Sequence, residues 1–428
     1  MILLSNYGFC VILSLKDVIN LERILVIGAG PAGITSAIHA KTDDNEVVIM
    51  EKNLKCGKKL LLTGNGHCNY WNEDESIIHF HSDSTNILNE IITVDNIKGA
   101  KKFIKKIGII PLVKNGYYYP FSNQSFTMLH ALITECNYKN IKIYLDSEVK
   151  MIKPLNKGFE VLYNDVVEYF DKVIIATGSM ATPKTGSDGL GYELAKKLNH
   201  QITRVEPSLV QIFCSSPYLK EWAGLRTHAK VSLYIDNAFQ KEEEGELQCT
   251  KEGISGIVSF NLSREASRSI HNYQKVTVKI NFLPFLNNEV ERFLNNQAKI
   301  MKNHTIGEII EGILHYKLVE IILKESKVDY NAKWENLTNE QKEIVINNLT
   351  SFTLPVIGVN NFQEAQTCSG GVSLTNLNPH TLESNIVKGL FFAGELIDID
   401  GDCGGYNLMT AWITGMLAGL GAKNDSSK

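Results

Sequence analysis

The sequence predicts an α/β protein in which a discontinuous Rossmann-like domain contains an inserted β-barrel-like domain and a small helical domain. Three patterns predict this fold: a β–α–β unit with a glycine-rich turn near the N-terminus, a buried strand followed by a helix near the C-terminus, and a strand-rich, then helix-rich stretch between them. The 428 residues are enough for about two or three domains. We expect an N-terminal extension at 1–21, the nucleotide-binding domain at 22–203 and 351–422, the barrel-like domain at 204–286, the helical insertion at 287–350, and a flexible tail at 423–428.

The composition is that of a soluble globular protein, with 44% hydrophobic and 21% charged residues. The net charge of −4 gives no overall attraction to nucleic acid or to an anionic membrane, so we expect neither as a partner. No apolar run reaches the length of about 18 residues that a membrane-spanning helix needs.

The eight cysteines form no C-x-x-C pair and no zinc-type spacing, which predicts reduced thiols in a cytoplasmic protein and no metal site. A redox disulfide between Cys56 and Cys68 is the alternative, although their spacing is wider than that of dithiol reductases.

A strand, a glycine-rich turn, a helix and a second strand follow one another from residue 23. The apolar run 23–27 leads into the pattern G-x-G-x-x-G, and apolar residues then recur at helical spacing from Ile34. The second strand, at 46–50, ends at an acidic residue. The glycines and the acid are Gly28, Gly30, Gly33 and Glu51. This is the context that a dinucleotide-binding turn requires.

Each of these four residues has a physical role in holding a dinucleotide. Gly28 permits the tight turn, Gly30 lets the backbone approach a pyrophosphate, and Gly33 lets the helix pack closely on the strand. The N-terminus of the helix provides N–H donors and a positive dipole for the phosphates. Glu51 can accept hydrogen bonds from ribose hydroxyl groups. The sequence therefore predicts a dinucleotide site at this turn.

The segment "KCGKKLLLTGNGHCNYWN" at 55–72 follows the second strand. Lys58 and Lys59 offer positive charge to phosphate, and the "TGNG" turn at 63–66 offers close backbone approach and N–H donors. We expect this segment to fold over the bound dinucleotide.

The C-terminal part of the chain indicates that the dinucleotide is FAD. A buried strand at 171–179 ends in Ala-Thr-Gly, another at 389–401 contains Gly-Glu, and a helix opens on glycines at 404–422. A nucleotide fold that begins at the N-terminus and is completed by the C-terminus is typical of FAD enzymes of the glutathione-reductase class. Only one intact glycine motif is present, so we predict no separate NAD domain. NAD(P)H would then dock on the flavin face or in the interdomain cleft.

The middle of the chain interrupts the nucleotide fold. The stretches 228–236 and 275–283 alternate like strands, whereas 288–301, 306–325 and 339–349 have helical patterns. These patterns predict the barrel-like domain and the helical insertion. We expect the insertion to cover the flavin and to shape the substrate site, since ligands often bind between domains.

Six segments in this order resemble the BaiN/YhiN-like family of NAD(P)/FAD-dependent oxidoreductases, which includes aminoacetone-oxidase-like flavoproteins. They are "GAGPAG", "GKKLLLTGNGHCN", "IIATGS…PKTGSDGLGYELAKKL", "EGISG", "GGV" and "GLFFAGELIDIDGDCGGYNLMTAW", within residues 22–422. The resemblance implies that FAD is bound by Gly28, Gly30, Pro31, Ala32, Gly33, Glu51, Lys52, Lys59, Leu60, Thr63, Gly64, Asn65, Gly66, Cys68, Asn69, Val149, Ala176, Thr177, Gly178, Gly394, Glu395, Gly404, Gly405, Tyr406, Asn407 and Leu408. His67, Ile257 and the segment 366–372 differ from the family pattern, and these differences concern the substrate pocket.

The resemblance also implies a function, namely an FAD-dependent oxidoreductase with NAD(P)H as the electron donor. Hydride would move through flavin N5 to or from a small or hydrophobic organic substrate, with an activated C=C bond among the candidate acceptors. A flavoprotein oxidase that uses oxygen and a non-catalytic flavin-binding redox sensor remain open as alternatives. The sequence identifies neither a catalytic residue nor the oligomeric state.

Overall fold

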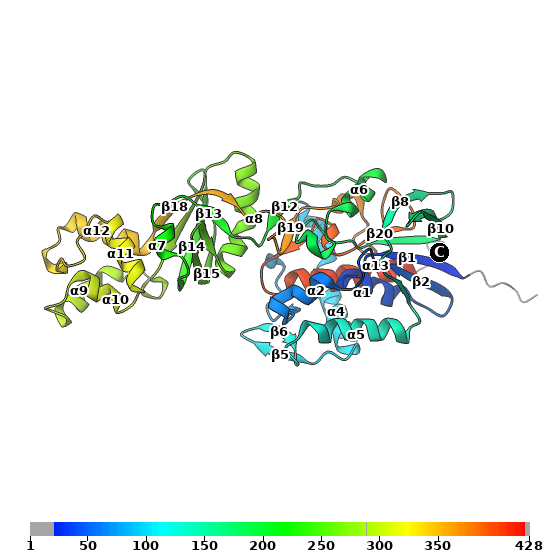
Figure 1. The fold of residues 1–428 in the computed structure, drawn as a ribbon, viewed down its shortest axis with the longest axis horizontal. Coiled ribbons are helices and arrows are strands. Elements are labelled where there is room, and N and C mark those ends of the chain that lie inside the picture. The colour runs from blue at the N-terminus through cyan, green and yellow to red at the C-terminus, as the bar shows by residue number, and fades with distance from the viewer. Residues whose placement is uncertain (1–20, 288, 424–428) are drawn as a thin grey trace, which may run out of the picture.

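The computed structural model describes residues 21–287 and 289–423. The predicted N-terminal extension, apart from Leu21, and the predicted tail, apart from Lys423, lie outside the described residues. Figure 1 shows an elongated molecule, with the nucleotide-binding part at one end, a barrel in the middle and a group of helices at the far end. No helix within the described ranges is long and apolar enough to cross a membrane.

A five-stranded parallel sheet forms the centre of the nucleotide-binding part. β1 (Glu22–Ile27) lies between β2 (Asn45–Met50) and β11 (Lys172–Ile175). β20 (Leu390–Phe392) extends the sheet beside β11, and β7 (Lys142–Tyr144) forms the other edge. The apolar residues of the three central strands are buried, as expected for a parallel sheet covered on both faces. The predicted Rossmann-like fold is confirmed, and β20 shows that the C-terminal part of the chain completes its sheet.

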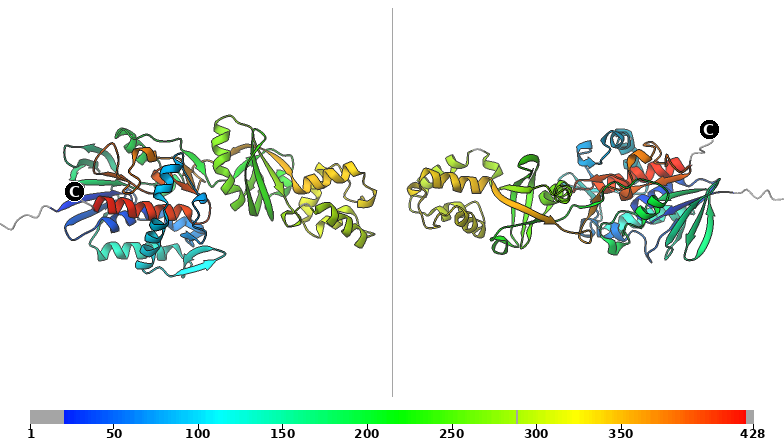
Figure 2. Two further views of the ribbon diagram at one scale, coloured as in Figure 1. Left: turned by 180° about the vertical axis from the view of Figure 1, so that it is seen from behind. Right: turned by 90° about the horizontal axis from the view of Figure 1, so that it is seen from above.

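Two helices pack against each other beside this sheet (Figures 1 and 2). α1 (Pro31–Ala40) follows β1 directly, and α13 (Tyr406–Lys423) is the last helix of the described chain. α13 is apolar nearly all round and buried along almost its whole length, which is the pattern of a helix enclosed by other elements. The other elements of this part are α2 (Lys58–Leu62), β3 (Trp71–Asn72), β4 (Phe80–His81), α3 (Thr85–Ile91), α4 (Val94–Lys106), β5 (Pro111–Lys114), β6 (Tyr117–Pro120), α5 (Ser125–Tyr138), β8 (Val149–Pro154), β9 (Phe159–Tyr163), β10 (Val166–Phe170), α6 (Leu190–Lys197), β12 (Glu206–Ser208), β19 (Thr367–Ser369) and β21 (Asp400–Gly401).

A closed six-stranded barrel occupies the middle of the molecule, in the strand order β13-β16-β15-β14-β17-β18. Alternate residues of its strands are buried, which fills the interior with side chains. The last strand, β18, falls within 351–422, the segment expected to return to the nucleotide-binding domain. The chain therefore returns to the nucleotide-binding domain only after β18, later than expected, because this strand is needed to close the barrel. The bounds are β13 (Ile212–Cys214), α7 (Leu219–Trp222), β14 (Arg226–Ile235), β15 (Ala238–Thr250), β16 (Gly253–Ser255), α8 (Ile257–His271), β17 (Val276–Asn281) and β18 (Phe352–Val359).

Four helices between β17 and β18 form the far end of the molecule (Figure 2). The helical run 306–325 divides in two, since the first helix ends at Glu311 and His315 caps the second. These helices lie on the side of the barrel away from the nucleotide-binding part, so the expectation that they cover the flavin is wrong. The helices are α9 (Val290–Ile300), α10 (Ile306–Glu311), α11 (Tyr316–Glu325) and α12 (Asn339–Thr350).

Candidate functional site

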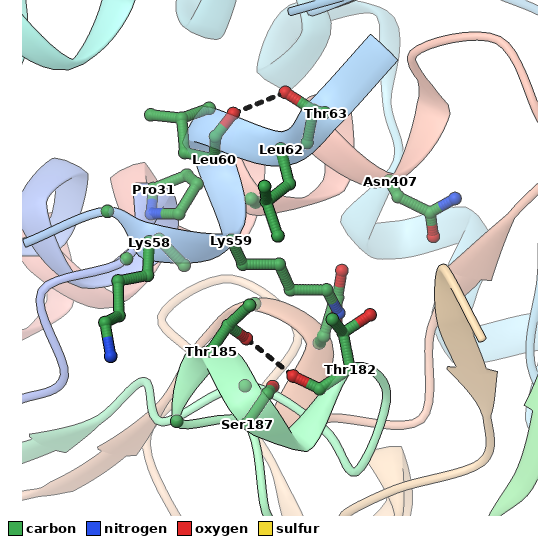
Figure 3. Close-up of a pocket in the computed structure, with 18 of the residues that line it drawn as sticks. Pro31, Lys58, Lys59, Leu60, Leu62, Thr63, Thr182, Thr185, Ser187 and Asn407 are labelled. Carbon is green, nitrogen blue, oxygen red and sulfur yellow. Dashed lines mark hydrogen bonds and ion pairs between the residues drawn. The ribbon is translucent and has the colours of Figure 1, made fainter. Parts of the chain in front are cut away.

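A large cavity lies in the nucleotide-binding part and reaches the edge of the barrel part. Its volume is about 580 Å³, within the usual range for small-molecule and cofactor sites. Figure 3 shows two of its walls, one from residues 58–63 and one that carries Thr182, Thr185 and Ser187. Most of the predicted cofactor residues line it, namely Gly28, Gly30, Pro31, Ala32, Glu51, Lys52, Lys59, Leu60, Thr63, Gly64, Asn65, Asn69, Val149, Ala176, Thr177, Gly178, Gly394, Glu395, Gly404, Gly405, Asn407 and Leu408.

Four of the predicted residues, Gly33, Gly66, Cys68 and Tyr406, are not part of the cavity lining. Gly33 serves the packing of the turn, because a Cβ atom there would lie 2.0 Å from the carbonyl oxygen of Gly28. Gly66 closes the "TGNG" turn with φ of 89°. Cys68 is fully buried, and the Tyr406 ring stacks on His79 with ring centroids 4.5 Å apart. These residues support the walls of the cavity from within the protein.

The turn before α1 has open space at Gly30. A Cβ atom on Gly30 would meet no atom within 4 Å, whereas one on Gly28 would lie 2.5 Å from the carbonyl oxygen of Ala176. Gly30 is the N-cap residue of α1, and no side chain caps the helix. The first N–H groups of α1 therefore remain available to a ligand. Uncapped backbone donors and a positive dipole at a cavity wall are what a pyrophosphate requires.

Glu51 follows β2 and is held in place by three hydrogen bonds. Its Oε2 accepts from the Ala29 N–H at 2.8 Å. Its Oε1 accepts from the Asn53 backbone N–H at 2.8 Å and from Asn53 Nδ2 at 2.6 Å. A carboxylate has about four acceptor positions, so one remains for a ligand hydroxyl group.

We expect the substitution Glu51→Gln to weaken both the fold and the binding of a dinucleotide. The new amide NH₂ group would face the donors of Ala29 or Asn53 and leave a buried donor unpaired, at a cost of about 1–3 kcal/mol. Thermal unfolding of the cofactor-free protein and an FAD titration measure the two effects. Glu148→Gln is the matched control, because Glu148 also lines the cavity but makes no hydrogen bond among the described residues. Equal unfolding temperatures for the two variants would contradict this role of Glu51.

The lysines of α2 are engaged within the protein. Lys58 Nζ donates to Asn53 Oδ1 at 2.8 Å, and Lys59 Nζ pairs with Glu395 Oε2 at 2.5 Å. Ser179 donates to the same Glu395 oxygen at 3.0 Å. Direct contact of these lysines with a phosphate group, as expected from the sequence, stays a prediction and would require these contacts to rearrange.

The N-terminus of α13 also borders the cavity, through residues 404–408. Gly405 is required by packing, because a Cβ atom there would lie 2.8 Å from the carbonyl carbon of Trp71. The Asn407 side chain holds the turn closed, since its Oδ1 accepts from the Gly401 N–H at 3.0 Å and its Nδ2 donates to the Gly401 carbonyl at 2.8 Å. The start of this second helix is therefore fixed in position at the cavity wall.

Sequence reasoning missed Tyr117, Tyr119 and Leu209, which form a group in the cavity wall together with Ile257 and Cys403. A signal was present, because Asn115-Gly116 precedes three consecutive tyrosines and predicts a β-hairpin. Burial raises the pKa of Tyr117 and of Tyr119 and raises that of Cys403 to about 11, so all three are protonated at neutral pH.

Two residues of the cavity wall have a backbone conformation that is unfavourable for their type. Thr182 has φ of 57° and Leu209 has φ of 54°. Such conformations cost on the order of 1–3 kcal/mol and cluster at ligand sites. Thr182 is held by its N–H, which donates to the Phe362 carbonyl at 2.8 Å, and by its hydroxyl, which donates to the Ala365 carbonyl at 2.7 Å.

Buried aspartates next to Cys403 connect the nucleotide-binding part to the barrel. Asp400 lies 3.0 and 3.1 Å from Nε of Arg264, which belongs to α8. Asp402 lies 3.0 Å from both His79 Nδ1 and His81 Nε2. Burial alone would raise the pKa of Asp402, but the hydrogen bond from His81 and the nearby positive charges lower it to about 2. These contacts join segments that are far apart in the sequence.

Asp398 is a third buried aspartate, and its environment differs. It is fully buried, and its Oδ2 accepts from the Ser82 hydroxyl at 3.2 Å and from the Asp83 N–H at 3.1 Å. Its Oδ1 has no partner among the described residues. Burial and the neighbouring Asp83 raise the pKa of Asp398 to about 7.

We expect the stability difference between the protein and its Asp398→Asn variant to depend on pH. The folded state keeps a proton on Asp398 up to about pH 7, whereas the unfolded state loses it near pH 4. The protein therefore loses stability relative to the variant as pH rises from about 4 to 7, by at most about 1.4 kcal/mol per pH unit. Urea unfolding of both proteins across this range measures the difference. A constant difference would contradict the raised pKa.

The seven cysteines of the described ranges are free. Burial raises the pKa of Cys56 to about 11 and that of Cys68 to about 12, so both are thiols rather than reactive thiolates. Within the part of the chain that the structure describes, no group of three or more His, Cys, Asp or Glu side chains could hold a metal ion.

The donors and acceptors of the cavity fit FAD. The open space at Gly30 and the uncapped start of α1 suit a pyrophosphate, and the remaining acceptor position of Glu51 suits a ribose hydroxyl. The α13 N-terminus provides donors for a second polar region of the ligand.

Comparison with known proteins gives one family and several relatives. The family model described as the HI0933-like protein Rossmann domain matches residues 22–421. A 3-dehydro-bile acid delta(4,6)-reductase from Clostridium scindens is 35% identical, and the match covers 94% of this chain and 99% of that protein. Ribosomal RNA dihydrouridine synthases from Escherichia coli and Haemophilus influenzae are 26% and 24% identical, covering 91% of this chain and 94% and 95% of those proteins.

Proposed function

Because the chain belongs to the HI0933-like family of BaiN/YhiN-type FAD-dependent oxidoreductases, we propose that it reduces a carbon–carbon double bond conjugated to a carbonyl group. The substrate in this proposal is a small hydrophobic molecule, and NAD(P)H is the electron donor.

The observation that carries the proposal is the position of the apolar and phenolic side chains. Tyr117, Tyr119, Leu209 and Ile257 line the same cavity as the predicted cofactor residues. A planar hydrophobic molecule bound against them would lie in one continuous space with the cofactor. Most ligand sites combine an apolar lining with a few polar groups in this way.

The relatives support the same chemistry. The name delta(4,6)-reductase describes reduction of ring double bonds in an oxo steroid, and the name dihydrouridine synthase describes reduction of the ring double bond of uridine. In both kinds of molecule the double bond can be conjugated to a carbonyl group. We therefore propose reduction of a conjugated double bond. Of the two kinds of substrate we favour a steroid-like molecule, because the identity to the bile-acid enzyme is higher than that to the RNA enzymes and the net charge is −4.

In this proposal, the residues of the chain bind and orient the cofactor and the substrate. The start of α1, Glu51 and the "TGNG" turn would hold the cofactor, and the start of α13 would hold its reactive end. FAD, when bound, supplies hydride from the flavin ring. The side chains around Tyr117 would hold the substrate carbonyl and limit access of water. The free thiols suit a reducing compartment, and we place the protein in the cytoplasm on that basis.

The test is product analysis with purified, FAD-loaded protein, NADH or NADPH, and no oxygen. The probes are a 3-oxo-Δ4 steroid, uridine and a ribosomal RNA transcript. We expect the steroid to gain two hydrogen atoms, as measured by mass spectrometry. Dihydrouridine in the transcript alone would instead favour the RNA activity of the other relatives. Peroxide production in air without reduction of any probe would indicate an oxidase, and absence of all turnover would indicate a redox sensor.

A further inference from the structure

The hairpin β5–β6 directs two of its three consecutive tyrosines to the cavity. Its turn, Asn115-Gly116, has φ of 50° and 82°, which suits the two-residue turns that match the twist of a hairpin. Side chains alternate along a strand, so Tyr117 and Tyr119 share one face and Tyr118 has the other. Tyr117 and Tyr119 line the cavity, whereas Lys101 Nζ lies 5.7 Å from the ring centroid of Tyr118.

Tyr117 is held beside the start of α13. It pairs with Asn72 of β3, and Asn72 Nδ2 donates to the Gly404 carbonyl at 2.9 Å. A Cβ atom on Gly404 would lie 2.9 Å from Cε1 of Tyr117, so the ring packs directly on this glycine. The phenol ring is thereby placed between the hairpin and the turn that begins α13.

The Tyr117 hydroxyl is available for chemistry. No hydrogen-bond partner for it is found in the described residues, although the side chain is only partly exposed. Burial first, and then the neighbouring Cys403, Tyr119 and Glu243, raise its pKa, so the phenol keeps its proton at neutral pH. A protonated, unpartnered hydroxyl at the wall of a cavity can donate to a ligand.

We infer that Tyr117 is the proton donor that completes reduction of the double bond. This inference rests on the proposed function. Hydride supplied by the cofactor forms a C–H bond at the β-carbon of the unsaturated carbonyl compound, and the electron pair of the double bond moves toward the carbonyl oxygen. The resulting enolate takes the Tyr117 hydroxyl proton at its α-carbon. The phenolate then regains a proton from water, and NAD(P)H provides the electron pair for each turnover.

Tyr117 suits this step better than its neighbours. Cys403 carries a thiol, which is a weaker hydrogen-bond donor than a phenol, and its side chain is shorter. Tyr119 is closer to the "TGNG" turn, which would hold the cofactor in this proposal, because a Cβ atom on Gly64 would lie 3.9 Å from the Cε1 atom of Tyr119.

The experiment compares Tyr117→Phe with the parent protein and with Tyr118→Phe, which removes a hydroxyl from the opposite face of the same strand. Each FAD-loaded protein is reduced without oxygen and mixed with a 3-oxo-Δ4 steroid in H₂O and in D₂O. Binding of the steroid to the oxidised proteins is measured separately through the flavin spectrum. We expect Tyr117→Phe to slow steroid reduction by about 10²- to 10⁴-fold, the usual contribution of a positioned acid.

The other readouts separate catalysis from structure. FAD content and reduction by NAD(P)H of Tyr117→Phe should stay within a few-fold of the parent. Its loss in the rate of steroid reduction should exceed any loss in steroid binding, and its solvent isotope effect and pH profile should change. Tyr118→Phe should match the parent in all of them. Rapid reduction by Tyr117→Phe, or a selective loss in Tyr119→Phe or Cys403→Ser instead, would overturn the inference while leaving the proposed function intact. Failure of the parent protein to reduce any conjugated double bond would overturn both.

Discussion

Replacement of Gly30 by aspartate should abolish FAD binding and leave the cofactor-free protein folded. The structure has room for the new side chain, because a Cβ atom on Gly30 meets nothing within 4 Å and φ is −83°. Aspartate is also a favoured N-cap residue, so it would satisfy an N–H group at the start of α1. The same carboxylate would repel a pyrophosphate. Two like charges about 4 Å apart cost about 4 kcal/mol at an effective dielectric constant of 20, or nearly a 10³-fold loss of affinity.

The measurement is an FAD titration combined with thermal unfolding of the cofactor-free variant. The unfolding temperature should be equal to or above that of the parent. Gly33→Ala is the contrasting variant, because its Cβ atom would lie 2.0 Å from the Gly28 carbonyl oxygen and should destabilise the protein itself. Gly358→Ala, whose Cβ atom would make only an ordinary contact at 3.5 Å, controls for loss of a glycine. Normal FAD affinity in Gly30→Asp would show that the pyrophosphate lies elsewhere.

Substitution of Arg264 by methionine should cost about 3–5 kcal/mol of stability, as expected when one partner of a buried ion pair is removed. Asp400 is only 1% exposed, and the Arg264 guanidinium lies 3.0 Å from it. The substitution would leave a carboxylate in the interior without its counter-charge. Because α8 carries Arg264 and the nucleotide-binding part carries Asp400, the loss should also loosen the connection between the two parts.

Urea unfolding followed by circular dichroism measures this cost. The surface pair of Arg226 and Glu246 gives the matched control: its Nη1–Oε1 distance is 2.8 Å but both side chains are exposed, so Arg226→Met should cost no more than about 1 kcal/mol. Combining Arg264→Met with Asp400→Asn should recover part of the loss, since the uncompensated charge is removed. Equal costs for the two arginine substitutions would show that burial does not set the strength of the Asp400 pair.

The sequence brings together the residues of the nucleotide-binding half of the candidate site because their requirements are local. Gly28, Gly33 and Glu51 lie within one β–α–β unit, and the need for a tight turn, close packing and an acceptor is expressed in residue type and spacing. The burial of β1 and the apolar character of α13 likewise follow from sequence pattern.

The other half could not be predicted in this way, because it is assembled from distant segments. Tyr117, Leu209 and Ile257 come from a hairpin, an interdomain connection and a helix start, and no short-range spacing links them. The helices α9–α12 lie away from the nucleotide-binding part because of how the barrel is oriented relative to that part. The periodicity of the residues does not encode this orientation. The engagement of Lys59 with Glu395, 336 positions away, is a tertiary contact of the same kind.

The most direct test of this account is a single turnover. Protein loaded with FAD and reduced in the absence of oxygen is mixed with a 3-oxo-Δ4 steroid, and the visible absorption of the flavin and the mass of the steroid are followed together. The account predicts that oxidised flavin reappears at a rate that rises with steroid concentration, and that one steroid gaining two hydrogen atoms forms per FAD. Flavin that stays reduced when mixed with each conjugated carbonyl probe, including uridine, while reacting with oxygen, would contradict it.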